Sequence, residues 1–181
     1  VEQYPDFWKY LLHWTGIAFE GDDESAVVDP RMPGARFFPG VRLNFAENLL
    51  RFDGGQTALV SVSEARDTQR LSYAGLRTEV SRLQARFVEM GIQPGDRIAG
   101  FVPNSSEAVI AMLAATSLGA VWSSCSPDFG VRGVLDRFGQ IEPRVLFAAN
   151  GYRYNGKRFD CLEKLEQIVA ALPTVERVVV F

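Results

Sequence analysis

One short stretch, residues 151–159, contains the side chains whose types and spacing could do chemistry. In this stretch, GYRYNGKRF, the cations Arg153, Lys157 and Arg158 are interleaved with tyrosine and phenylalanine around an Asn-Gly pair. Guanidinium and ammonium groups bind phosphate oxygens, and an aromatic ring can stack on a nucleobase. The stretch therefore predicts either a site for a phosphorylated nucleotide or a solvated hairpin whose charges only keep it soluble.

Other patterns that would do chemistry are missing from the sequence. The single histidine, His13, has no second histidine or cysteine near it, which favours a packed or surface imidazole over a ligand or base. No G-x-x-x-x-G-K-S/T, G-x-G-x-x-G or G-x-S-x-G motif occurs. Cys125 and Cys161 match no metal or redox spacing, which is typical of a reducing cytoplasm. We therefore predict no catalytic residue, no metal ligand and a cytoplasmic location.

The elements that would position the basic stretch begin with a strand, helix and strand between residues 95 and 130. A short apolar strand at 98–102 ends at a proline, and a nearly all-apolar helix then runs to Gly119. A second strand follows at 120–124, and a crossover of this length makes the two strands parallel. Open α/β sheets usually bind ligands at the carboxyl ends of such strands.

The rest of the chain extends this pattern in both directions. Two strands surround a polar turn and lead into an amphipathic helix capped by Ser72, and later helices alternate with short apolar strands. The expected strands are 57–62, 70–73, 145–148 and 175–181, and the expected helices are 73–90, 131–141 and 161–172. This alternation predicts an α/β fold with a parallel sheet covered on both faces. The far edge of the last strand is expected to need a neighbour.

The first 55 residues have a different character. A helix at 4–14 has a wide aromatic face, an irregular connection rich in glycine and proline spans 16–39, and Asn44 caps a short helix at 45–52. We predict that residues 1–55 form an extension that packs on a larger domain. Residues 56–181 would then be the first, incomplete α/β subdomain of that domain.

Composition limits the possible partners. The 181 residues are 47% hydrophobic and 12% aromatic, as in a globular protein, and their net charge of −3 argues against a nucleic-acid partner. No signal peptide and no apolar run long enough for a membrane span is evident. The chain begins with valine, which suggests trimming or a fragment of a longer protein.

Residues 69–130, from QRLSYAGLR to SSCSPDFG, resemble the opening of the large domain of the adenylate-forming acyl-CoA synthetases. Within that superfamily, residues 38–50 (FPGVRLNFAENLL) and 119–147 (GAVWSSCSPDFGVRGVLDRFGQIEPRVLF) are most similar to the branch that activates acetoacetate. The resemblance implies a two-step ligase that needs ATP, Mg²⁺ and CoA. A carboxylate and ATP give an acyl-adenylate and pyrophosphate, and the CoA thiol then displaces AMP.

The resemblance also implies which residues would touch substrate. In this superfamily the ATP motifs and the catalytic lysine lie beyond the point that Phe181 matches, so this piece alone should be inactive and needs the remainder of its own polypeptide. Trp122, Ser123 and Ser124 match a segment that borders the CoA tunnel, although a tryptophan there is also typical of a core. The turn containing Arg153, Lys157 and Arg158 matches one that contacts a CoA phosphate.

Two alternatives remain open at this point. The acid could be acetate, propionate or another short carboxylate, because the residues that line the acyl pocket come later in these enzymes. The chain could also be a non-catalytic α/β module that binds a nucleotide or a protein through its unfinished sheet edge.

Overall fold

The structure, a computed structural model, describes residues 3–64 and 66–181. The chain divides into two compact units, Val1–Arg51 and Phe52–Phe181. The domain boundary expected at residue 55 stays a prediction. No helix among the described residues has the length and apolar character needed to cross a membrane.

The first unit contains two helices and two small antiparallel sheets. The helices are α1 (Tyr4–Trp14) and α2 (Phe45–Leu50), and Asn44 caps α2 by accepting a hydrogen bond from the Glu47 amide at 3.1 Å. The sheets pair β1 (Glu20–Gly21) with β4 (Val41–Arg42), and β2 (Val27–Asp29) with β3 (Arg36–Phe37). Three of these strands, β1, β2 and β3, lie within residues 16–39, so the expectation of an irregular connection there is wrong at those positions. They were missed because strands of two or three residues are too short to show an alternating pattern.

The single histidine lies in this unit. His13 is in α1, with its side chain 57% exposed, and its Nε2 lies 2.6 Å from Oδ2 of Asp23. This exposed pair agrees with the surface interpretation of the imidazole.

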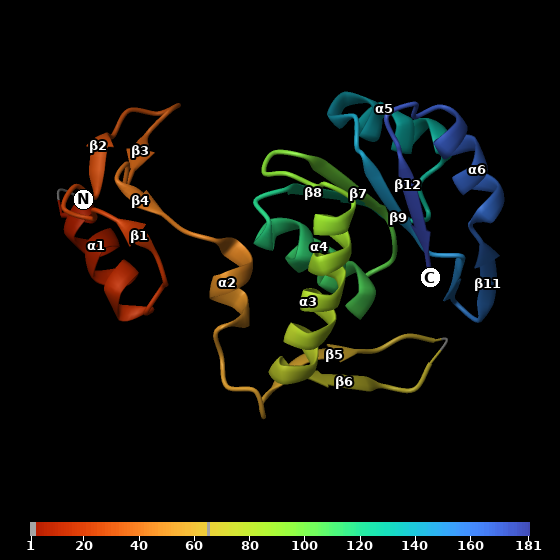
Figure 1. Cartoon of the computed structure of the whole chain (residues 1–181), viewed down its shortest axis with the longest axis horizontal. Helices are drawn as coiled ribbons and strands as arrows, with labels where there is room; N and C mark the ends of the chain where they lie inside the picture. Colours follow the sequence, from red (N-terminus) through yellow and green to blue (C-terminus); the bar gives the residue numbers. More distant parts are fainter. Residues whose placement is uncertain (1–2, 65) are drawn as a thin grey trace. The chain divides into compact units, whose positions relative to one another are not determined.

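The second unit is built on a four-stranded parallel sheet with the order β12-β9-β7-β8 (Figure 1). The strands are β7 (Arg97–Phe101), β8 (Val121–Cys125), β9 (Val145–Ala148) and β12 (Arg177–Val180), and all three neighbouring pairs are parallel. The predicted α/β fold is confirmed. Parallel strands joined by buried helices need little sequence signal beyond short apolar runs and helical periodicity, and this chain has both.

Helices cover both faces of this sheet (Figure 1). On one face, Phe87 of α3 (Tyr73–Glu89) meets Phe147 of β9 edge-on with ring centroids 5.9 Å apart, and α4 (Ser106–Ser117) packs beside α3. On the other face, α5 (Val131–Ile141) and α6 (Leu162–Ala170) supply Val134, Phe138 and Ile168 to a core cluster that is fully buried at these positions.

Two antiparallel hairpins stand outside the main sheet. One pairs β5 (Thr57–Ser61) with β6 (Gln69–Ser72), the strands expected around the polar turn. The other pairs β10 (Gly151–Tyr154) with β11 (Lys157–Asp160), so the basic stretch is a hairpin. In the second unit, β12 is an edge strand whose Val178 and Val180 are partly exposed, as its apolar sequence and late position predict.

Candidate functional site

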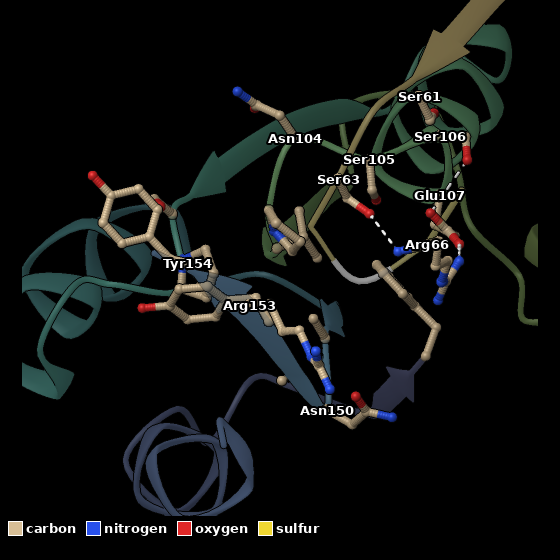
Figure 2. A pocket seen from close by; sticks show the side chains of 18 of the residues that line it. Ser61, Ser63, Arg66, Asn104, Ser105, Ser106, Glu107, Asn150, Arg153 and Tyr154 are labelled. Carbon is tan, nitrogen blue, oxygen red and sulfur yellow. Dashed lines mark hydrogen bonds and ion pairs between the residues drawn. The ribbon is translucent and has the colours of Figure 1, made fainter. Parts of the chain in front are cut away.

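A cavity of about 780 Å³ lies where the parallel strands end. Val102 follows β7, Ser124 is near the end of β8, Ala149 follows β9 and Phe181 follows β12, and all four line the cavity. This is the edge of an open α/β sheet at which ligands usually bind. The cavity is therefore the candidate site, and Figure 2 shows its polar lining.

The β5–β6 loop and the β10–β11 hairpin form two walls of this cavity. From the loop, Arg66 Nη1 lies 3.0 Å from Glu107 Oε1 at the start of α4 (Figure 2). From the hairpin, Arg153 extends its guanidinium toward Asn150 (Figure 2). No ion pair of Arg153 is seen within residues 3–64 and 66–181, so its charge is available to a ligand.

The start of α4 is held by its own polar residues. Ser105 caps the helix by accepting a hydrogen bond from the Ala108 amide at 3.4 Å. Burial opposes ionisation of Glu107, but hydrogen bonds from its own backbone amide, from Ser105 and from Arg66 outweigh burial and lower its pKa. Glu107 is thus a carboxylate at neutral pH, where it holds the β5–β6 loop through Arg66.

The hairpin divides the three predicted phosphate-binding cations between its two faces. Its turn residues Asn155 and Gly156 have φ angles of 51° and 72°, so both are left-handed, as an Asn-Gly hairpin turn requires. Arg153 lies opposite Arg158 in the register, and Tyr154 lies opposite Lys157. Side chains of directly opposed residues share one face, and neighbours along a strand alternate. Lys157 therefore lies on the opposite face from the two arginines.

A carboxylate from the β5–β6 loop occupies the tip of the hairpin. Glu64 accepts the Asn155 amide on Oε1 at 2.9 Å and the Gly156 amide on Oε2 at 2.8 Å. These two bonds, Gly156 first, lower the pKa of Glu64, and the positive charge of Arg153 adds to the effect. The turn thus presents two amides that bind an anion.

The structure brings only two of the six predicted site residues together in the cavity. Ser124 and Arg153 are among its lining residues. Lys157 and Arg158 are exposed on β11 and are not among the described residues that line it, and neither is half-buried Ser123. Trp122 packs against neighbouring residues instead. Its ring centroid lies 6.0 Å from that of Phe147, and a Cβ added at Gly100 would lie only 2.7 Å from the Trp122 ring.

Three residues of the site were not predicted from the sequence. Arg66 and Asn150 line the cavity, and Glu64 binds the turn of the hairpin. Glu64 and Arg66 lie in a polar segment predicted to be a plain turn, and Asn150 follows a strand without any motif. The contacts of Glu64 span 91 and 92 residues of sequence. No local pattern indicates a contact of that range, so only the polarity of the segment pointed to these residues.

The described residues contain neither a metal cluster nor an activated thiol. Nowhere in the part that the structure describes do three His, Cys, Asp or Glu side chains come together to hold a metal ion. Cys125 and Cys161 are free and buried, and burial raises the pKa of each thiol. Both thiols are therefore protonated at neutral pH and unsuited to act as nucleophiles.

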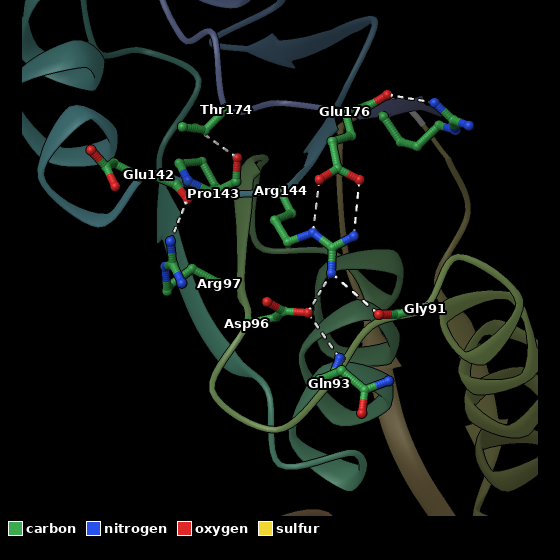
Figure 3. Close-up of polar contacts among 10 residues, drawn as sticks. Gly91, Gln93, Asp96, Arg97, Glu142, Pro143, Arg144, Thr174 and Glu176 are labelled. Carbon is green, nitrogen blue, oxygen red and sulfur yellow. Dashed lines mark hydrogen bonds and ion pairs between the residues drawn. The ribbon is translucent and has the colours of Figure 1, made fainter.

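The opposite end of the same sheet is closed by a charge network (Figure 3). Arg144, just before β9, donates to Asp96 at 2.6 Å and to both oxygens of Glu176 at 2.9 and 3.0 Å. Asp96 also accepts the Gln93 amide at 2.8 Å. Glu176 and then Asp96 raise the pKa of Arg144. Three loops at the amino ends of the strands are thus joined by one guanidinium.

The comparison with known protein families agrees with this arrangement. Residues 45–181 match the family model described as AMP-binding enzyme. The chain belongs to this family. The match includes the parallel sheet, its covering helices, both hairpins and the cavity between them, and it confirms the resemblance to adenylate-forming enzymes.

Individual members of the AMP-binding enzyme family resemble the chain over nearly all its length. It is 47% identical to the acetoacetyl-coenzyme A synthetase of Rhizobium meliloti (strain 1021), over 97% of this chain and 27% of that protein. A solved structure, acetoacetyl-CoA synthetase from Streptomyces lividans, superposes with a TM-score of 0.94 at 42% identity over 99% of this chain and 28% of that one.

A third relative carries a different name. Malonamoyl-CoA synthetase vrtB of Penicillium aethiopicum is 43% identical over 96% of this chain and 25% of that protein. The chain thus spans between 25% and 28% of the length of these three proteins. Its fold is that of the corresponding part of an acetoacetyl-CoA synthetase.

Proposed function

We propose that this chain is the N-terminal part of an ATP-dependent ligase that joins acetoacetate to CoA. The observation that supports this most directly is the TM-score of 0.94 to an acetoacetyl-CoA synthetase, with 42% identity over 99% of the chain. In the first step an acetoacetate oxygen attacks the α-phosphorus of ATP and pyrophosphate leaves. In the second step the CoA sulfur attacks the acyl carbon and AMP leaves with the bonding electrons. The products are acetoacetyl-CoA, AMP and pyrophosphate.

The residues of this chain would bind and position substrate in that ligase. Arg153 and Ser124 line the same cavity, and a guanidinium without an ion pair in the described residues is suited to a CoA phosphate. Lys157 and Arg158 on β11 would add charge at the hairpin from outside the cavity. Trp122 and Ser123 are proposed to support the cavity wall from behind the residues that line it. No catalytic role is proposed for any residue of this chain.

Mg²⁺ belongs to the proposal as the ion that accompanies ATP. The described residues bring no three His, Cys, Asp or Glu side chains together, so they do not fit a resident metal and no step is assigned to one. Small molecules are the proposed partners, and the net charge of −3 favours them over nucleic acid. The two free cysteines are consistent with the predicted cytoplasmic location.

A second candidate function is a ligase for another short acid. The malonamoyl-CoA synthetase relative, at 43% identity, is nearly as similar as the relatives named for acetoacetate. The similarity of this chain to its relatives therefore does not distinguish acetoacetate from another short acid as the substrate.

The test is pyrophosphate release by the full-length protein with ATP and each of acetoacetate, acetate, propionate and malonamate. The reaction is repeated without CoA, when adenylate formation should stop after about one turnover. We expect the highest kcat/KM with acetoacetate. A preference for another acid would retain the ligase and change its substrate. No release with any acid would contradict the proposal and favour a non-catalytic binding module.

A further inference from the structure

The turn of the basic hairpin already holds an anion that belongs to the protein itself. Two consecutive amides, those of Asn155 and Gly156, each donate to a different oxygen of the Glu64 carboxylate, at 2.9 and 2.8 Å. Both turn residues have positive φ angles, and this conformation directs the two amides outward from the hairpin to one acceptor. A bidentate carboxylate has the geometry that two oxygens of a phosphate group would have at the same place.

Glu64 is charged in this position. The two amide bonds, that of Gly156 first, hold its pKa below the usual range of a glutamate, and Arg153 on the adjacent strand contributes in the same direction. The carboxylate, two amides and a guanidinium thus form one small electrostatic unit, of which Arg153 lines the cavity. An incoming phosphate would find the same donors, but only after the carboxylate had left, because two anions cannot share them.

The β5–β6 loop that carries Glu64 has a second, independent attachment. Arg66 pairs with Glu107 of α4 at 3.0 Å, and its amide donates to Ser63 Oγ at 3.2 Å within the loop. Release of Glu64 would therefore free the hairpin from the loop without detaching the loop from the rest of the unit. A contact that can open while its surroundings remain fixed is suited to exchange with a ligand.

We propose that Glu64 is an internal competitor: it occupies the Asn155 and Gly156 amides, and a phosphate monoester of CoA takes its place. The monoester is favoured over a diester because it has three free oxygens and close to two negative charges, enough for both amides and Arg153 together. This inference rests on the proposed function, because it takes CoA as the ligand. It adds a device by which CoA binding would release the β10–β11 hairpin, one wall of the cavity, from the β5–β6 loop.

The test compares wild-type full-length protein with Glu64→Ala, Glu64→Gln and the control Glu166→Gln, an exposed carboxylate on α6. Calorimetry measures binding of CoA and of dephospho-CoA, which lacks the monoester. Hydrogen exchange of peptides spanning residues 150–161 reports the turn amides without added ligand. Glu64→Ala should exchange faster there and bind CoA roughly three- to tenfold more tightly, with dephospho-CoA unchanged. Glu64→Gln should fall between, and Glu166→Gln should match wild type.

Several outcomes would overturn this inference. One is unchanged exchange at the turn in Glu64→Ala, and another is an equal change in the affinities for CoA and dephospho-CoA. Weaker CoA binding in Glu64→Ala would make Glu64 a support of the site and not its competitor. A wild-type protein that binds CoA and releases pyrophosphate but shows any of these results keeps the proposed function. A wild-type protein that does neither refutes the proposed function and the displacement together.

Discussion

The two ends of the parallel sheet differ in how their charges are paired. At the amino ends, Arg144 joins Asp96 and Glu176, so the loops before three strands are joined side chain to side chain. At the carboxyl ends the loops separate around a cavity of about 780 Å³, and Arg153 makes no ion pair within the described residues. The same sheet therefore has one end whose charges stabilise the fold and one whose charges remain available for binding.

A single strand, β8, connects these two environments. Trp122 pairs with Ile98 in the register and covers Gly100 with its ring, whereas Ser124 pairs with Gly100 two residues later and lines the cavity. The change from packing to binding takes place within two residues because parallel strands end together at one edge. The comparison predicts that substitutions at the two positions separate stability from CoA binding.

The largest expected effect is on stability, in Trp122→Ala. The half-buried ring contacts Phe147 and fills the space over Gly100, so its loss should lower the free energy of unfolding by roughly 2–3 kcal/mol, less than for a fully buried tryptophan. Chemical denaturation measures this loss. The KM for CoA should change less than about twofold, because Trp122 is not among the residues that line the cavity.

Ser124→Ala is the matched variant on the same strand. It should leave the denaturation midpoint nearly unchanged, because Ser124 is exposed, and any effect should appear in the KM for CoA. If instead Trp122→Ala raised that KM strongly without lowering stability, the division of β8 would be wrong and the CoA-contact hypothesis for Trp122 would be favoured.

The next effect compares one residue type at the two ends. Arg144→Ala should lower the melting temperature by several degrees, because Asp96 loses the guanidinium that it contacts at 2.6 Å. Arg153→Ala should leave the melting temperature nearly unchanged and raise the KM for CoA severalfold, with acetoacetate-dependent adenylate formation retained. Thermal melts, steady-state rates at varied CoA concentration and single-turnover adenylation assays on the full-length protein measure these quantities.

Two further variants control this pair. Arg82→Ala removes an exposed partner of Glu79 within α3 and should change the melting temperature little, since surface pairs contribute little. Lys157→Ala, on the other face of the hairpin, should raise the KM for CoA less than Arg153→Ala does. Equal effects of both hairpin variants would contradict the assignment of Arg153 alone to the cavity.

The sequence predicted most of the fold because its signals are local. Asn44 and Ser72 act as helix caps as expected, since a cap depends on residues three positions away. The apolar runs at β7 and β9 gave buried strands for a similar reason. The strands of two or three residues in the first unit escaped because such short segments have no periodicity.

The candidate site was predicted less completely because its contacts are not local. The basic hairpin was evident from composition, yet the separation of Lys157 from Arg153 depends on the register of a turn at Asn155 and Gly156. Glu64 reaches that turn across 91 residues, and no spacing rule covers such a distance. Family resemblance pointed to the region, and only the three-dimensional arrangement showed which side chains share the cavity.

The smallest expected effect concerns pH and tests the amino end alone. The hydrogen bond from the Gln93 amide, with Arg144 adding, holds the pKa of Asp96 below the usual range of an aspartate. A carboxylate whose pKa is lower in the folded state stabilises the fold fully above the unfolded pKa, and this contribution is lost as the pH falls through the folded pKa. The melting temperatures of wild type and Asp96→Asn should therefore differ by a constant amount from pH 7 down to roughly pH 5, and converge below about pH 4.

Glu166→Gln, for which the described residues show no hydrogen bond to the side chain, should run parallel to wild type. A difference between wild type and Asp96→Asn that persisted unchanged to pH 3 would mean that the ionised carboxylate is not what joins the loops at this end, and the contrast with the cavity would then rest on Glu176.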